Sequence, residues 1–238
     1  MANFDVKVAS RYTLRESALL ELRNAITTGA LESGRHLGEI ELSNSLGVSR
    51  GTLREALRHL QQEGLVMQDG RGRVSVKQMT PDDIRNLFEV RTGLEAMALT
   101  RLCAKSDRST AVTELRALLD ELRLHESDLL EGMNADLRFH EALCRLSGNT
   151  VLENSWRSLS GLVRLAMISA GPSRARANMA YERHAPIVQF IEEGDTGGGV
   201  EFLTKHMQNA VDVLLDDGES GQSSALLKGS PGRAADED

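Results

Sequence analysis

Aromatic residues are scarce in this chain of 238 residues, at 3% of the composition. With so few large rings, the interior must pack chiefly on Leu, Ala, Val and Ile, a composition that favours helices. The hydrophobic fraction of 40% still supports real cores, and the length corresponds to one large domain or two modest ones. We therefore predict a mainly α-helical fold.

Cysteines and long apolar runs are also few. The two cysteines, Cys103 and Cys144, make no disulfide framework, which favours a reducing, cytoplasmic setting. The first residues, MANFDVKVASRYTLRE, contain no apolar signal-peptide core. No apolar run approaches the roughly 18 residues that a membrane-spanning helix needs. We therefore expect a cytoplasmic protein without membrane attachment.

Charge is divided unevenly along the chain. The formal net charge of -7 argues against a general nucleic-acid binder. However, residues 1–78 carry 11 Lys and Arg against 9 Asp and Glu, a net of +2, and the remainder carries a net of -9. A basic-leaning first part on an acidic second part fits a DNA-binding module joined to another domain.

The pattern of residues 1–78 predicts three helices and a β-hairpin. The helices are expected at 15–28, 39–46 and 50–63, and the strands at 65–67 and 74–76. Gly47-Val48-Ser49 makes the turn before the third helix, with Ser49 as its N-cap. Asp69-Gly70 is a hairpin turn signal. Together these elements predict a winged helix-turn-helix.

The pattern changes after the hairpin. Thr80-Pro81 starts a helix, with Thr as N-cap and Pro at the first helical position, which puts a domain boundary near 77–80. Helices are then expected at 81–104, 108–131, 133–146, 150–170, 174–193 and 198–216. We predict a DNA-binding domain at 1–78, an all-helical bundle at 79–217, and a disordered tail at 218–238 rich in Gly, Ser and Ala.

The third helix carries the candidate DNA contacts. Arg50, Arg54 and Arg58 recur every four residues, a spacing at which like charges repel unless an anionic partner is present. A recognition helix presents its N-terminal residues to the major groove, where Arg reads guanine. The alternative is a solvated, Arg-rich helix. The residues expected to contact DNA are Ser49, Arg50, Thr52, Arg54 and, at the hairpin tip, Gly70, Arg71 and Gly72.

Four polar residues fall on the apolar faces of helices in the second part. Asp136 and His140 are four residues apart, and His184 and His206 lie on two later helices. A single histidine on an apolar face is more often a hydrogen-bonded core residue than a ligand. Three of them with a carboxylate in one small bundle favour a divalent metal ion, Zn, Ni, Fe or Mn.

Arg91 also falls on an apolar helix face, and a buried arginine requires an anion. Two interpretations stay open. Glu95, four residues on, supplies the negative charge, or Arg91 binds the carboxylate of an effector, for which the guanidinium geometry is suited.

These motifs resemble a known family. The run GVSRGTLREALRHLQQEGLV is similar to the winged helix of GntR-family bacterial transcription regulators, and LFEVRTGLEAMAL, ADLRFHEALCRLSGN and the last two histidines resemble the FCD domain of the FadR subfamily. The resemblance implies that residues matching Ser49, Arg50, Thr52, Arg54 and a wing glycine contact operator DNA. It also implies a metal at the positions matching Asp136, His140, His184 and His206, bound in turn by a small organic acid. That complete set argues against acyl-CoA as ligand.

The motifs together predict a bacterial transcription regulator, a repressor by family habit. Its partners are double-stranded operator DNA, a small carboxylate effector and a second copy of the chain, since helix-turn-helix operators are usually symmetric. Two alternatives remain. Three histidines and an acid also describe the site of a metal-dependent enzyme acting on a small organic acid, and the metal of a regulator can be purely structural.

Overall fold

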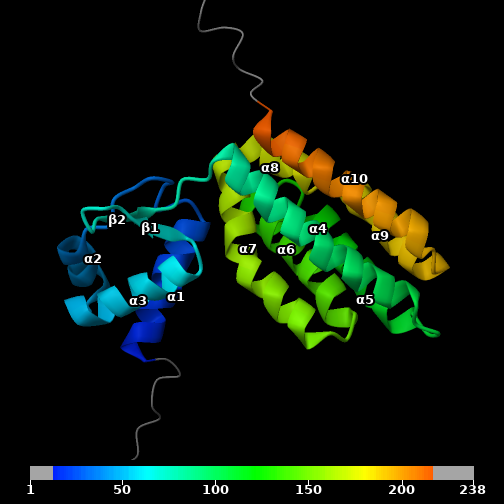
Figure 1. Cartoon of the computed structure of the whole chain (residues 1–238), viewed down its shortest axis with the longest axis horizontal. Coiled ribbons are helices and arrows are strands. Elements are labelled where there is room, and N and C mark those ends of the chain that lie inside the picture. The colour runs from blue at the N-terminus through cyan, green and yellow to red at the C-terminus, as the bar shows by residue number, and fades with distance from the viewer. Residues whose placement is uncertain (1–12, 217–238) are drawn as a thin grey trace, which may run out of the picture.

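The computed structural model describes residues 13–216 in two units, a small one at the N-terminal side and a larger helical bundle (Figure 1). The tail predicted at 218–238 lies outside the described residues. Among the described residues, no helix is long and apolar enough to cross a membrane. The mainly helical fold predicted from the composition is confirmed.

The N-terminal unit is a winged helix-turn-helix, as predicted. It consists of α1 (Leu14–Thr27), α2 (Glu39–Leu46), α3 (Arg50–Gln62), β1 (Val66–Gln68) and β2 (Val74–Val76). The two strands pair antiparallel, with Val66 opposite Val76. The apolar face of α3 is buried because Leu53 and Leu60 lie in the core between α1 and the hairpin. The opposite face of α3 is left to solvent, where its arginines lie.

The helical bundle contains α4 (Pro81–Cys103), α5 (Ser109–Leu124), α6 (Leu129–Leu146), α7 (Thr150–Ala170), α8 (Pro172–Asn178), α9 (Tyr181–Glu193) and α10 (Thr196–Leu215). Thr80 caps α4 by accepting a hydrogen bond from the Asp83 backbone N–H, and the Asp83 carboxylate accepts one from the Thr80 N–H in return. One apolar core, rich in Leu, Ala and Met, runs through the bundle.

Several predicted helix boundaries were wrong. The helix expected at 108–131 ends at Leu124, and the helix expected at 133–146 begins at Leu129, because Asp128 caps the N–H groups of Leu130 and Glu131. The helix expected at 174–193 is two helices, which meet at Met179 and Ala180. The last helix starts at Thr196 instead of residue 198, because Asp195 caps it through the Gly198 N–H.

Helix α7 joins the two units. Its residue Leu165 is 1% exposed and lies in the core of the N-terminal unit, not in that of the bundle. Nearby, a side chain carbon added at Gly64 would lie 3.4 Å from Leu162. In Figure 1, α7 runs along the side of the bundle that faces the N-terminal unit. One helix therefore contributes to both cores.

Candidate metal centre and DNA-binding surface

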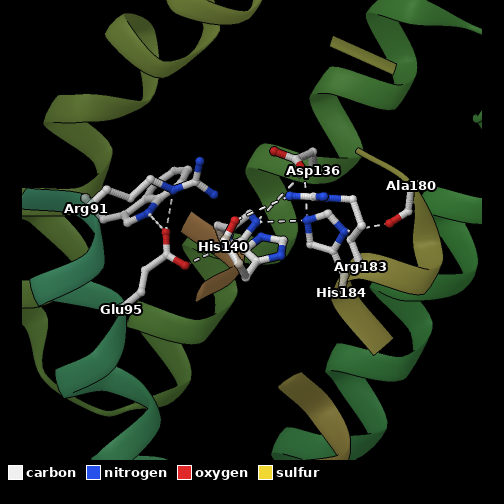
Figure 2. A network of polar contacts seen from close by, with 9 residues as sticks. Arg91, Glu95, Asp136, His140, Ala180, Arg183 and His184 are labelled. Carbon is white, nitrogen blue, oxygen red and sulfur yellow. Dashed lines mark hydrogen bonds and ion pairs between the residues drawn. The ribbon is translucent and has the colours of Figure 1, made fainter. Parts of the chain in front are cut away.

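Three histidines meet inside the bundle. His140 comes from α6, His184 from α9 and His206 from α10, and their candidate ligand nitrogens all lie within 4.8 Å of one another. All three are buried, and so is Asp136, one turn before His140 on α6. Figure 2 shows Asp136 and His184 on one side of His140, with Glu95 on the other. The structure thus brings together the four residues singled out from the sequence.

The hydrogen bonds of the outer ring nitrogens orient two of the imidazoles. His184 Nδ1 lies 2.9 Å from the Ala180 carbonyl oxygen, which only accepts, so this nitrogen carries the proton. His140 Nδ1 lies 2.6 Å from a carboxylate oxygen of Glu95. The buried ion pair of Glu95 with Arg91 favours a carboxylate that accepts from His140 Nδ1. With the proton on Nδ1, the Nε2 atom of each of the two rings faces inward.

Those inward lone pairs face one another. The Nε2 atoms of His140 and His184 are 3.1 Å apart, and Asp136 Oδ1 is 3.0 Å from His184 Nε2 and 3.9 Å from His140 Nε2. Three acceptor atoms at such distances repel unless a cation lies among them. One metal ion bound to all of these atoms would remove the repulsion.

The electrostatics of the cluster disfavour protons on two of the rings. Burial, followed by the charge of Arg91, lowers the pKa of His140 well below its ordinary value of 6.5. Burial, followed by His184, does the same to the pKa of His206. Burial alone would raise the pKa of Asp136, but its contact with His184 and the nearby positive groups outweigh burial and lower that pKa. The lowered pKa values of His140, His206 and Asp136 favour the deprotonated forms of these groups, which are the forms that bind metals.

The spacing fits a single ion. Nitrogen and oxygen ligands bind divalent metals at about 2.0–2.2 Å, which puts neighbouring ligand atoms about 3.0 Å apart around an octahedral ion and about 3.4 Å around a tetrahedral one. The separations of 3.0, 3.1 and 3.9 Å bracket these values. Three imidazoles and one carboxylate suit Zn, Ni, Fe or Mn.

Arg91 forms an ion pair with Glu95, one of the two interpretations that the sequence left open. Its side chain is 4% exposed, and its Nε donates to Glu95 at 2.7 Å. Its guanidinium also lies over the Phe88 ring, 5.2 Å from the centroid. Glu95 therefore balances the buried charge. A contact between Arg91 and an effector stays a prediction.

Two other arginines near the cluster were missed from the sequence. Arg183 Nη2 donates to the His206 carbonyl oxygen at 3.3 Å, while its buried Nε has no hydrogen-bond partner among the described residues. Arg164 donates to the Asn134 side chain. Burial lowers the pKa of both guanidinium groups, and the charge of Asp136 partly offsets that effect in each. No helical pattern signals them, since both are only partly buried.

A cleft of about 820 Å³ lies between the two units. Arg23 and Thr27 of α1 line one side, and Asn134, Trp156 and Arg164 of the bundle line the other. Trp156 connects this cleft to the histidine cluster, because it donates to Glu95, which contacts His140.

The candidate DNA contacts lie on exposed parts of the N-terminal unit. Arg50 and Arg54 are exposed on α3, and Arg54 is held by Glu39 of α2 through both carboxylate oxygens at 2.9 Å. Ser49 accepts from the Thr52 backbone N–H at 3.1 Å, and the two hydroxyls are 2.9 Å apart. These side chains thus form one surface at the start of α3.

The hairpin tip is exposed and built on one aspartate. Asp69 Oδ1 accepts from the backbone N–H groups of Arg71 and Arg73 at 2.9 Å. Gly72 has φ +80, a left-handed conformation that favours glycine. This leaves Gly70 and the Arg71 side chain exposed at the tip. Their contact with DNA stays a prediction.

Two family models match the chain over these same units. The model described as bacterial regulatory proteins, gntR family, matches residues 10–76, and the model described as FCD domain matches residues 86–209. The chain belongs to the GntR family, with an FCD domain of the FadR-like type. The resemblance drawn from the sequence motifs is thereby confirmed.

Relatives of this GntR-family chain are regulators. It is 32% identical over 210 residues to an HTH-type transcriptional regulator of Streptomyces ambofaciens, covering 86% of this chain and 85% of that one. It is 26% identical over 205 residues to the gluconate operon transcriptional repressor of Bacillus subtilis, covering 82% and 83%. A solved GntR regulator structure from Rhodococcus sp. RHA1 superposes with a TM-score of 0.72 at 27% identity, covering 84% and 97%.

These relatives decide between two of the functional alternatives. They are transcriptional regulators and not enzymes, so the chain is a GntR/FCD transcriptional regulator and the enzyme alternative is set aside. The buried His140, His184 and His206 agree with the metal site typical of FCD domains.

Proposed function

We propose that this regulator represses transcription, and that a small carboxylate effector bound at a divalent metal centre releases it from its operator. The observation that carries the metal is the set of inward-facing acceptors, two Nε2 atoms 3.1 Å apart with the Asp136 carboxylate beside them. Asp136, His140, His184 and His206 would hold the ion. A divalent ion with open coordination positions supplies a Lewis-acid contact for a carboxylate oxygen.

The charges around the centre support a carboxylate as the effector. Arg183 has an unpaired buried Nε and lies close enough to Asp136 for that carboxylate to affect its pKa. A guanidinium binds a carboxylate through parallel hydrogen bonds. Arg183 is therefore a stronger candidate clamp than Arg91, whose Nε is already occupied by Glu95. Arg91 remains a second candidate through its other nitrogens.

For the DNA, we propose that α3 enters the major groove. Arg50 and Arg54 then contact base edges, Ser49 and Thr52 contact phosphates, and the hairpin tip at Gly70, Arg71 and Gly72 contacts the backbone or the minor groove. The exposure of these residues on one end of the N-terminal unit supports this arrangement. We also propose that each chain is divided into its two domains at residue 78 and that the protein is cytoplasmic. We propose a homodimer because a symmetric pair of winged helices matches a symmetric operator.

The proposal is tested by elemental analysis of the purified chain, followed by a thermal-shift screen of small carboxylates on the metal-loaded protein. A ligand of the folded state raises the melting temperature by mass action. We expect one equivalent of a divalent metal per chain and a shift that the variant Arg183→Met loses. A chain that takes up none of Zn²⁺, Ni²⁺, Mn²⁺ or Fe²⁺ would contradict the proposal.

A purely structural metal is distinguished by the variant His206→Ala. If the metal only stabilises the bundle, effector response and folding are lost together. A folded variant that binds operator DNA as tightly as the parent, yet no longer responds to the effector, establishes a sensory metal. Operator affinity is compared at fixed salt, since phosphate contacts depend steeply on ionic strength.

A further inference from the structure

Glu95 is a fully buried carboxylate at the meeting point of three helices. It is 0% exposed and accepts three hydrogen bonds, one each from side chains of α4, α6 and α7. The donors are Arg91 Nε at 2.7 Å, Trp156 Nε1 at 2.8 Å and His140 Nδ1 at 2.6 Å. Figure 2 shows Glu95 between Arg91 and His140. A buried carboxylate costs much free energy unless it is paired and fully hydrogen-bonded, so these three donors account for its place there.

The bond to His140 has a definite chemical effect. A carboxylate at Nδ1 keeps the proton on that nitrogen, fixes the ring orientation and makes Nε2 a stronger base. Nε2 is the atom that faces His184. Glu95 itself does not touch the cluster of acceptor atoms, and Arg91 balances its charge. The pair therefore prepares one ligand without joining the ligand set.

The hydrogen bond from Trp156 connects Glu95 to α7, the helix that also contacts the N-terminal unit. Trp156 belongs to α7, is 1% exposed and lines the cleft between the units. Two to three turns further along, α7 places Leu165 in the core of the N-terminal unit. The ring of His140 and the docking surface of the DNA-binding unit are thus connected by two hydrogen bonds and one rigid helix.

We propose that Glu95 is the positioning residue for the metal ligand His140, and that Trp156 carries that position to α7 and so to the docked N-terminal unit. This inference rests on the proposed metal function. It assigns Arg91 a definite role as the counter-ion of Glu95. A shift of the His140 ring upon metal uptake moves the Glu95 carboxylate, and the indole that donates to it follows.

The first experiment measures metal affinity. Full-length protein is stripped with a chelator and titrated with Zn²⁺ in competition with a fluorescent zinc chelator. We expect Glu95→Gln to weaken Zn²⁺ binding by about 10–100-fold, the usual loss when such a carboxylate partner of a metal-binding histidine is removed. The control is Glu89→Gln, an exposed glutamate on the same helix, which leaves affinity unchanged.

A second variant guards against misfolding, since Glu95→Gln leaves Arg91 buried without a counter-charge. The double variant Arg91→Met, Glu95→Gln removes both charges together. If it folds with native circular dichroism and binds Zn²⁺ as tightly as the parent, Glu95 has no positioning role and the inference is overturned. If the parent binds no Zn²⁺ at all, the proposed function fails instead, so the two failures are distinguishable.

The second experiment uses Trp156, which is the one tryptophan of the chain. Its emission, excited at a wavelength that tyrosine does not absorb, responds to changes in the surroundings of the indole, which include the hydrogen bond to Glu95. We expect Zn²⁺ to change this emission in the parent and to leave it unchanged in the double variant. Emission that ignores saturating Zn²⁺ in the parent would overturn the link from His140 to Trp156.

Amide hydrogen exchange then measures whether Zn²⁺ binding changes the protection of backbone N–H groups along α7. We expect Zn²⁺ to slow exchange in the part of α7 that contains Leu162 and Leu165. In Trp156→Phe, which keeps the aromatic ring but loses the N–H donor, the parent's zinc affinity is largely kept and this protection is lost. Equal protection in both proteins would show that α7 does not receive the signal through Trp156.

Discussion

Removing the metal should destabilise the protein by an amount that mass action sets. With free metal at about 100 times its dissociation constant, binding to the folded state contributes about 2.7 kcal/mol. For a chain of this size, each kcal/mol moves the melting temperature by about 2–4 °C. We therefore expect chelation to lower the melting temperature by about 5–10 °C, and re-addition of Zn²⁺ or Ni²⁺ to restore it, as measured by differential scanning fluorimetry.

The pH dependence of the metal-free protein follows from the same cluster. Burial lowers the pKa of His140 and His206 in the folded state, so below about pH 6.5 the unfolded chain binds more protons than the folded one. Stability is therefore full above that pH and declines as the pH falls. We expect the metal-free protein to be less stable at pH 5.5 than at pH 7.5, as measured by urea denaturation at the two pH values.

Two variants test whether the effect of the chelator on the melting temperature comes from the histidine cluster or from another part of the chain. Asp136→Asn keeps the shape but removes the charge, so the melting temperature of this variant should no longer respond to the chelator. His59→Ala removes an exposed imidazole on α3 and should respond as the parent does. A parent whose melting temperature ignores both chelator and every divalent metal would refute the argument, and the cation of the cluster would then be a proton on His184.

Three further predictions concern the surface of α3 and two glycines. Arg54→Ala should weaken operator binding by about 5–150-fold at fixed salt, as expected for the loss of one base contact of about 1–3 kcal/mol. The control is Arg85→Ala, which removes an exposed arginine on α4 and should leave the affinity unchanged. Equal affinities of the Arg54→Ala variant and the parent in anisotropy titrations would contradict the proposed interface. Gly199→Ala should destabilise by about 1–3 kcal/mol in urea, because its new carbon would lie 2.9 Å from Leu99. Gly93→Ala, with nothing within 4 Å, should stabilise by up to about 1 kcal/mol.

Local patterns predicted the elements of the N-terminal unit and the burial of the four polar residues Asp136, His140, His184 and His206, for a physical reason. A capping Ser49, a glycine in the turn and an Asp-Gly hairpin act within a few residues, so the sequence alone specifies them. His184 and His206 were found because a polar group on an apolar helix face departs from the period of its own helix. The boundary between α8 and α9 was missed because no cap signal marks it: Ala180 precedes α9 without a side-chain hydrogen bond.

The partners of the predicted residues were harder to find, because they depend on which helices become neighbours. Helical spacing placed Glu95 beside Arg91 but gave no means to know that α6 and α7 would bring His140 and Trp156 to the same carboxylate. Trp156 looks like an ordinary core aromatic in the sequence, and only its Nε1 donor makes it part of the centre. Arg91, interpreted from the sequence as either an effector clamp or an ion-pair partner, is in the structure the counter-ion that lets Glu95 remain charged at His140. A charged residue on an apolar helix face thus marks a buried polar cluster in this chain, while its role is decided by the tertiary contacts around it.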